Sequence, residues 1–203
     1  MPEETLQEFH PFTSQQARDR YLAHYAARET SWPIESETKT VVTEHGTTFL
    51  RVSGPVGAPP LVLFPGGQST SLIWRRVIAP LSARFRTYAL DAIYDQGRSV
   101  PARPMRDVAD LTAWLDGVLD GLGLTDGVHM AGMSDGAYAT AEYALHAPRR
   151  LRNGATAHPR EVLAHLAAVA PRIETMLVPE AGHDVVVAQP RLVADRMLAF
   201  LAE

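Results

Sequence analysis

Ser134 is the residue best placed for covalent chemistry, because it stands between two glycines in the segment VHMAGMSDGAYATAEYALHAP. Gly132, Ser134 and Gly136 form the pattern Gly-x-Ser-x-Gly, in which a sharp turn between a strand and a helix exposes a serine hydroxyl. An apolar run precedes this pentapeptide and a run of small residues follows it, as a strand and a helix would require. A serine held in this way can attack a carbonyl carbon once a base takes its proton. We therefore predict that Ser134 is a nucleophile.

Two further segments supply groups that such a nucleophile needs. The segment LVLFPGG ends an apolar run with glycines, and the N–H of Gly67 can bind an oxyanion together with the N–H of Asp135. His183 stands in the segment VPEAGHDVVV, which follows a late strand and comes after the serine in the chain. That order predicts His183 as the general base.

The acid that would complete a Ser-His-acid triad is not evident from the sequence. The acids between Asp135 and His183 are Glu142, Glu161, Glu174 and Glu180. Glu180 shares a loop with His183, whereas the others are expected on helices or at the far end of a strand. The triad acid is therefore unassigned, with Glu180 as the best of these candidates.

Asp135 raises a separate question, because a carboxylate directly after the nucleophile opposes the negative charge that develops on an oxyanion. It has two interpretations. Asp135 pairs with a cationic group of the substrate, or it points away from the site and stabilises the N-terminus of the following helix. Tyr138 also has two interpretations, since it can pack in the core or line the substrate pocket.

The length, charge and residue composition of the chain argue against several other classes of function. The chain has 203 residues, of which 46% are hydrophobic, with a formal net charge of −4 and no cysteine. This length suits one well-buried core, so we predict a single domain over residues 1–203 with a helical extension at 1–37. The acidic balance argues against nucleic acid and anionic lipid as partners, and no apolar run is long enough to span a membrane. We therefore expect a cytoplasmic protein that binds a small molecule and uses no cofactor and no metal.

The hydrophobic pattern alternates strands with helices along most of the chain. Thr13 and Gln16 have the spacing of a capping box at the start of a first helix. Two β-branched runs within 39–53 have the pattern of a hairpin, and residues 61–64 form a continuous apolar run typical of a strand buried on both faces. A helix capped between residues 69 and 71 follows. This order predicts an α/β fold with a mostly parallel central sheet.

Taken together, these segments resemble the α/β-hydrolase superfamily. The matching stretches are LVLFPGG, LDAIYDQGRS, GMSDGAYATAEYALHAPRRLR and VPEAGHDVVVAQPRLVADRMLAFL. The resemblance implies a three-layer fold, Ser134 as nucleophile, His183 as general base and an acyl-enzyme formed from esters, amides or related substrates. The Ser-Asp-Gly turn is similar to that of valacyclovirase-like hydrolases, in which the acid after the nucleophile recognises the α-amino group of amino-acid esters. That similarity implies the substrate-binding role of Asp135.

The chain departs from the family pattern after Leu151. The family has a further strand, a helical cap and another strand with the triad acid, whereas RRLRNGATAHPREVL leads from Leu151 almost directly into a helix at 159–169. We therefore expect a shortened fold that lacks the cap and about two strands, with an abridged junction near 151–158. The last strand would then lie beside the strand that precedes Ser134, or an edge would be exposed.

Two functions are compatible with these residues. The first is a serine hydrolase acting on carboxylic esters or related small acyl substrates, with weak activity if the triad acid is absent. The alternative is a non-catalytic domain that keeps the scaffold and binds a small molecule. The oligomeric state cannot be predicted from these residues.

Overall fold

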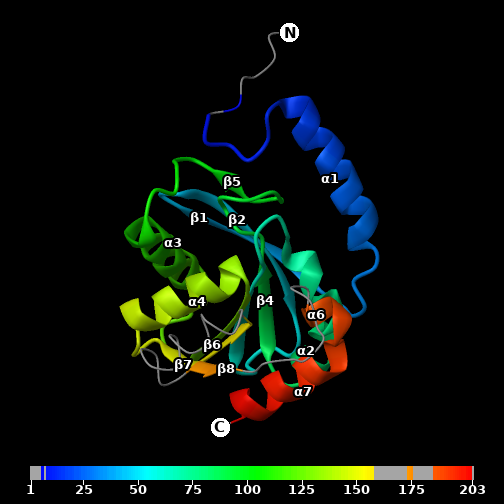
Figure 1. The fold of residues 1–203 in the computed structure, drawn as a ribbon, viewed down its shortest axis with the longest axis vertical. Coiled ribbons are helices and arrows are strands. Elements are labelled where there is room, and N and C mark those ends of the chain that lie inside the picture. Colours follow the sequence, from blue (N-terminus) through cyan, green and yellow to red (C-terminus); the bar gives the residue numbers. More distant parts are fainter. Residues whose placement is uncertain (1–5, 7, 158–172, 176–184, 203) are drawn as a thin grey trace.

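The computed structural model (Figure 1) describes residues 6, 8–157, 173–175 and 185–202, without the side chains of 153–157 and 173–175. In chain order its elements are α1 (Gln15–Glu29), β1 (Glu37–Thr43), β2 (Gly46–Ser53), β3 (Pro60–Phe64), η1 (Ser71–Arg76), α2 (Ile78–Ser82), β4 (Arg86–Leu90), β5 (Val100–Pro101), α3 (Val108–Gly121), β6 (Val128–Met133), α4 (Asp135–His146), β7 (Leu151–Ala157), β8 (Ile173–Thr175), α6 (Val185–Ala188) and α7 (Pro190–Leu201). None of the described helices combines the length and the apolar character needed to cross a membrane.

The strands form one mixed sheet in the order β1-β2-β4-β3-β6-β7-β8, with the short β5 paired to β2. β1 and β4 each run antiparallel to β2, whereas β4, β3, β6, β7 and β8 are parallel to one another. At the centre of the sheet, Phe64 at the end of β3 pairs with Gly132 near the end of β6. Because parallel strands end at the same edge, the loops that follow β3 and β6 are neighbours. The predicted α/β class with a mostly parallel sheet is confirmed.

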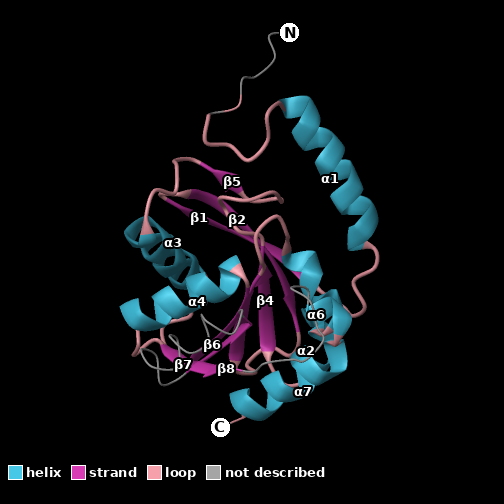
Figure 2. Cartoon of the chain, viewed as in Figure 1, coloured by secondary structure: helices cyan, strands magenta, loops and turns pink. Residues whose placement is uncertain are grey.

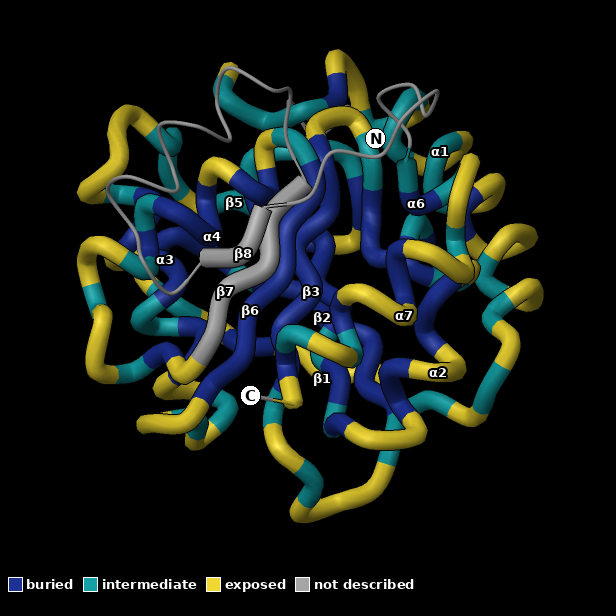
Figure 3. Tube along the Cα trace, turned by 60° about the horizontal axis from the view of Figure 1, so that its bottom comes forward, coloured by how far each residue is buried: buried dark blue, intermediate teal, exposed yellow. Residues whose placement is uncertain are grey.

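Helices cover both faces of the sheet and make three layers (Figure 2). One face packs against α3 and α4, and the other packs against η1, α2, α6 and α7. The residues of β3 alternate between the two layers: Val62 and Phe64 face the first, and Leu61 and Leu63 face the second. All four are fully buried, as is most of the central sheet in Figure 3. Burial on both faces explains the continuous apolar run in the sequence.

The segment after Leu151 differs from expectation. Leu151–Ala157 forms β7, which pairs in parallel with the whole of β6. The prediction that no strand follows Leu151 was therefore wrong, and β8 pairs with β7 instead of lying beside the strand that precedes Ser134. The sequence LRNGATA has no aromatic residue and a single β-branched one, Thr156, so local propensity gave little signal. Pairing with β6 supplies the hydrogen bonds that hold this strand. The predicted helix at 159–169 lies outside the described residues.

The starts of two helices also differ in detail from the predictions. The N-cap of α1 is Ser14, one residue after the predicted Thr13, and its hydroxyl accepts a hydrogen bond from the Ala17 N–H at 3.1 Å. Thr70 caps the next helical segment within the predicted interval. That segment is divided at Val77 into η1 and α2, where a single helix was expected.

Candidate active site

Ser134 occupies a tight turn between β6 and α4, in the place predicted from the glycine pattern. Its backbone has φ 54° and ψ −119°, in a region that residues with a Cβ rarely adopt and that costs about 1–3 kcal/mol. Ser134 is half-buried and is the N-cap residue of α4, but its hydroxyl makes no capping hydrogen bond. Within the described structure, that hydroxyl is therefore free to react.

The two glycines of the Ser134 turn (residues 132–136) are required by close backbone contacts. A Cβ on Gly132 would lie 2.0 Å from the Gly136 oxygen, and a Cβ on Gly136 would lie 2.3 Å from the Pro65 oxygen. The first contact closes the turn on itself, and the second packs the start of α4 onto the end of β3. Both positions therefore exclude any side chain, which is the physical reason for the pattern seen in the sequence.

The loop after β3, residues 65–69, lies against the Ser134 turn. We call it the glycine loop. A Cβ on Gly66 would lie 3.3 Å from the Ser134 Cβ, so the two segments are in contact. In the described part of the chain, neither the Gly67 N–H nor the Asp135 N–H donates a hydrogen bond, whereas the Gln68 N–H donates to the Asp95 carboxylate. The two donors named from the sequence thus both lack an acceptor in the described structure.

Asp135 is exposed, and its carboxylate leans toward the glycine loop. A Cβ on Gly67 would lie 2.2 Å from Asp135 Oδ2. Its charge also acts on Tyr94: burial raises the pKa of the Tyr94 hydroxyl, and the charges of Asp135 and Asp95 raise it further. Asp135 lies in the first turn of α4, where the helix dipole favours an anion, but no capping hydrogen bond to it is found in the described structure. The carboxylate therefore faces the candidate site.

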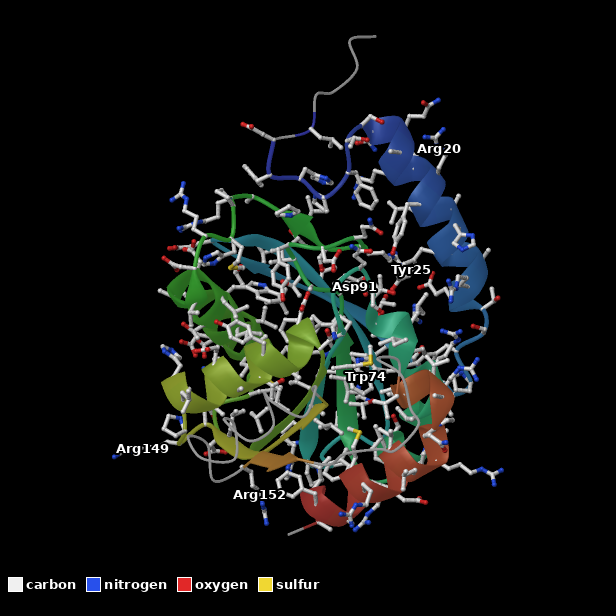
Figure 4. The ribbon with its side chains drawn as sticks, viewed as in Figure 1. Arg20, Tyr25, Trp74, Asp91, Arg149 and Arg152 are labelled. Atoms are coloured by element: carbon white, nitrogen blue, oxygen red, sulfur yellow. The ribbon has the colours of Figure 1, made fainter. Side chains whose placement is uncertain are left out.

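A buried carboxylate, Asp91, lies beside Tyr25 of α1 (Figure 4). Asp91 is fully buried at the end of β4 and accepts hydrogen bonds from the Ser71 N–H at 2.8 Å, the Arg98 N–H at 2.9 Å and the Tyr25 hydroxyl at 3.4 Å. Burial raises the pKa of this carboxyl group, and the hydrogen bonds oppose that rise. Sequence analysis assigned no role to Asp91. Its position directly after an apolar strand was the only local signal.

The remaining predicted site residues are not brought together in the described structure. Tyr138 is 47% exposed on α4, so it does not pack in the core. His183, Glu161 and Glu180 lie outside the described residues. Glu174 lies in β8 without a described side chain. No cluster of three or more His, Asp or Glu side chains that could hold a metal occurs among the described residues.

Comparisons with known proteins agree with the fold described above. The family model described as the alpha/beta hydrolase fold matches residues 59–173. The chain is 37% identical over 156 residues to carboxylesterase YbfK of Bacillus subtilis (strain 168), an alignment that covers 77% of this chain and 52% of the relative. It is 36% identical over 142 residues to the uncharacterized carboxylesterase nap of the same organism, covering 70% and 47% respectively. The chain therefore spans about half the length of these two relatives.

Solved structures share the fold. The crystal structure of carboxylesterase CesB (YbfK) from Bacillus subtilis superposes with a TM-score of 0.86 at 24% identity, over 92% of this chain and 98% of that one. Naproxen esterase from Bacillus subtilis superposes with a TM-score of 0.85 at 22% identity, over 94% and 99%. The strand order, the layers and the family match agree, and the chain belongs to the α/β-hydrolase fold family.

Proposed function

We propose that this protein is a serine hydrolase that cleaves carboxylic esters of small molecules through an acyl-enzyme on Ser134. The observation that carries the proposal is the arrangement at the edge of the sheet. Ser134 lies in a strained turn, and its hydroxyl makes no hydrogen bond to the described residues. Beside it lie the N–H groups of Gly67 and Asp135, which have no acceptor in the described structure. A positioned nucleophile beside such donors is the arrangement that acyl transfer needs.

In the proposed reaction, His183 takes the proton of the Ser134 hydroxyl as the serine oxygen attacks the ester carbonyl carbon. The carbonyl oxygen becomes an oxyanion, which the N–H groups of Gly67 and Asp135 stabilise. Collapse of this intermediate breaks the bond to the alcohol, which leaves with the proton from His183. Water then attacks the acyl-enzyme by the same steps in reverse and releases the acid. Glu180 is retained as the candidate that orients His183.

The choice of esters rests on the relatives, both of which are named carboxylesterases. Because this chain spans about half of their length, ester hydrolysis is a proposal for this protein. A small-molecule acyl substrate stays a prediction from the Ser134 motif and the family resemblance. A cytoplasmic location and the lack of a nucleic-acid partner stay predictions based on composition.

The test is labelling with a fluorophosphonate, followed by intact mass and peptide mapping. The proposal expects one phosphonyl group per chain on Ser134 and none in Ser134→Ala. His183→Ala should react at least 100-fold more slowly, since general base catalysis contributes about 10²–10⁴-fold. The matched control is His24→Ala, which changes an exposed histidine on α1 and should label at the wild-type rate.

Two results would contradict the proposal. Labelling at another residue would remove Ser134 from the chemistry. No labelling of a demonstrably folded protein would favour the alternative function, a non-catalytic domain that binds a small molecule.

A further inference from the structure

We propose that Asp95 is a positioning residue for ester hydrolysis, because its carboxylate holds the glycine loop in the shape that presents the Gly67 N–H to the reacting carbonyl. This inference rests on the proposed function. Asp95 lies in the loop after β4, between Leu90 and Val100, and comes from a different part of the chain than either Ser134 or the glycine loop.

The carboxylate of Asp95 joins two loops through its two oxygens. Oδ1 accepts a hydrogen bond from the Gln96 N–H at 2.7 Å, within its own loop. Oδ2 accepts a hydrogen bond from the Gln68 N–H, 27 residues earlier in the chain. Carboxylate oxygens that accept backbone N–H groups make charge-assisted hydrogen bonds, which are stronger than neutral ones. One side chain therefore links the two loops directly.

The glycine loop has few other supports. Inside it, the Ser69 N–H donates to the Gly66 oxygen at 3.2 Å. The bond to Asp95 is the only hydrogen bond in the described structure that ties the backbone of 66–69 to another segment. Gly67 and Gln68 are both exposed, so burial adds little to hold them beyond the contact of Gly67 with the Asp135 side chain. The shape of the loop depends on Asp95.

The conformation of Gln68 shows why this support matters. Its φ is 56°, in the left-handed region that residues with a side chain rarely adopt. Without an acceptor for its N–H, Gln68 would relax toward an ordinary conformation. That rotation would turn the peptide between Gly67 and Gln68 and displace the backbone of Gly67, whose N–H is a proposed oxyanion donor.

Asp95 also binds the Gln68 N–H, the backbone donor directly after the proposed oxyanion donor, the Gly67 N–H. The Gln68 N–H is bound to this carboxylate, whereas the Gly67 N–H has no acceptor among the described residues and can bind the substrate oxygen. The carboxylate thus acts through the backbone, and it does not need to touch the substrate. This separates the role of Asp95 from the charge-pairing role considered for Asp135.

The test compares Asp95→Ala, which removes both acceptors, with Asp95→Asn, which keeps one. The matched control is Asp126→Asn, which removes an exposed charge remote from these contacts. We would measure kcat and KM on a neutral p-nitrophenyl ester, the inhibition constant of a trifluoromethyl ketone that forms a serine-bound oxyanion, and hydrogen exchange of the Gln68 amide.

Losing one oxyanion donor costs about 10²–10³-fold in kcat. We expect Asp95→Ala to lower kcat by at least 10-fold with KM changed less than threefold, and to weaken the ketone by a similar factor. Asp95→Asn should lie between Asp95→Ala and the wild type, Gln68 should lose protection in Asp95→Ala, and Asp126→Asn should match the wild type.

The inference is overturned if Asp95→Ala keeps its kcat within twofold. It is also overturned if kcat and thermal stability fall together while ketone binding is unchanged, since a merely structural role gives that result. If Asp95→Asn and Asp95→Ala lose kcat equally, the effect comes from the charge of Asp95, and the inference is overturned as well. If wild-type Ser134 does not react with a fluorophosphonate, the proposed function fails and this role fails with it. The exchange of Gln68 then reports separately whether Asp95 holds the loop.

Discussion

The carboxylate of Asp135 lies against Gly67, so the two residues whose N–H groups are proposed to bind the oxyanion are in contact between the start of α4 and the glycine loop. A negative charge at this point opposes the charge that develops in an ester-hydrolysing transition state. It would also attract a cationic group of a substrate. The repulsion slows ester hydrolysis and the attraction speeds it for cationic esters, so rates on cationic and neutral esters separate the two effects.

We predict that Asp135→Asn changes substrate preference. Wild-type enzyme should hydrolyse an ester that carries an ammonium group about 5-fold faster in kcat/KM than its neutral isostere, the size expected for an exposed charge pair. The variant should lose that preference, and its kcat on the neutral ester should stay equal or rise. Equal wild-type rates on the two esters would contradict the substrate-binding role of Asp135.

We predict that Gly136→Ala disables the Ser134 turn. The added Cβ would meet the Pro65 oxygen at 2.3 Å and the Phe64 oxygen at 2.5 Å, and backbone atoms cannot move aside easily. Fluorophosphonate labelling of Ser134 should fall at least 10-fold at a temperature where the variant is folded by circular dichroism. Gly57→Ala is the control, because its φ of 84° carries a conformational cost but its Cβ would meet no atom within 4 Å. Equal labelling in the two variants would show that the contact with β3 is unimportant.

We predict that Tyr25→Phe weakens the attachment of α1 to the sheet. The Tyr25 hydroxyl hydrogen-bonds with Ser71 at 3.0 Å and with Asp91 at 3.4 Å in a buried site. Losing these buried hydrogen bonds costs about 1–3 kcal/mol, which corresponds to a fall in Tm of about 2–12 °C for a chain of this size. Tyr21→Phe on the same helix is the control, since its hydroxyl has no hydrogen bond in the described structure. Calorimetry that finds equal Tm values for the two variants would refute this attachment.

We predict that His129 makes stability depend on pH. Burial lowers the pKa of His129 and the charge of Arg152 lowers it further, and Nδ1 has no hydrogen-bond partner among the described residues. The unfolded chain takes up this proton near pH 6.5, before the folded protein does. Below that pH the unfolded state therefore binds more protons, and the free energy of unfolding falls by up to about 1.4 kcal/mol per pH unit until the lower folded pKa is reached.

Urea unfolding between pH 7.5 and 5.5 measures this dependence. The wild type should lose more stability than His129→Phe over that range, whereas His24→Gln, which changes an exposed histidine, should follow the wild type. Identical curves for the wild type and His129→Phe would mean that His129 does not titrate differently in the folded state.

The sequence by itself determined the features that depend on neighbours along the chain. The spacing of glycines around Ser134 predicts the turn, because those positions are dictated by backbone contacts within and beside it. The apolar run of β3 predicts a strand buried on both faces, because that burial requires every residue to be apolar. Local signals of this kind need no knowledge of the rest of the fold.

Only the tertiary structure decided the features that join distant residues. The strand β7 has little local signal and is held by its pairing with β6 and β8. Tyr25 meets Asp91 across 66 positions, and Gln68 meets Asp95 across 27. A single sequence contains no periodicity or spacing that links such pairs, since their distance depends on how the strands are ordered in the sheet. The supports of the candidate site follow from that order, and its proposed nucleophile follows from a local pattern.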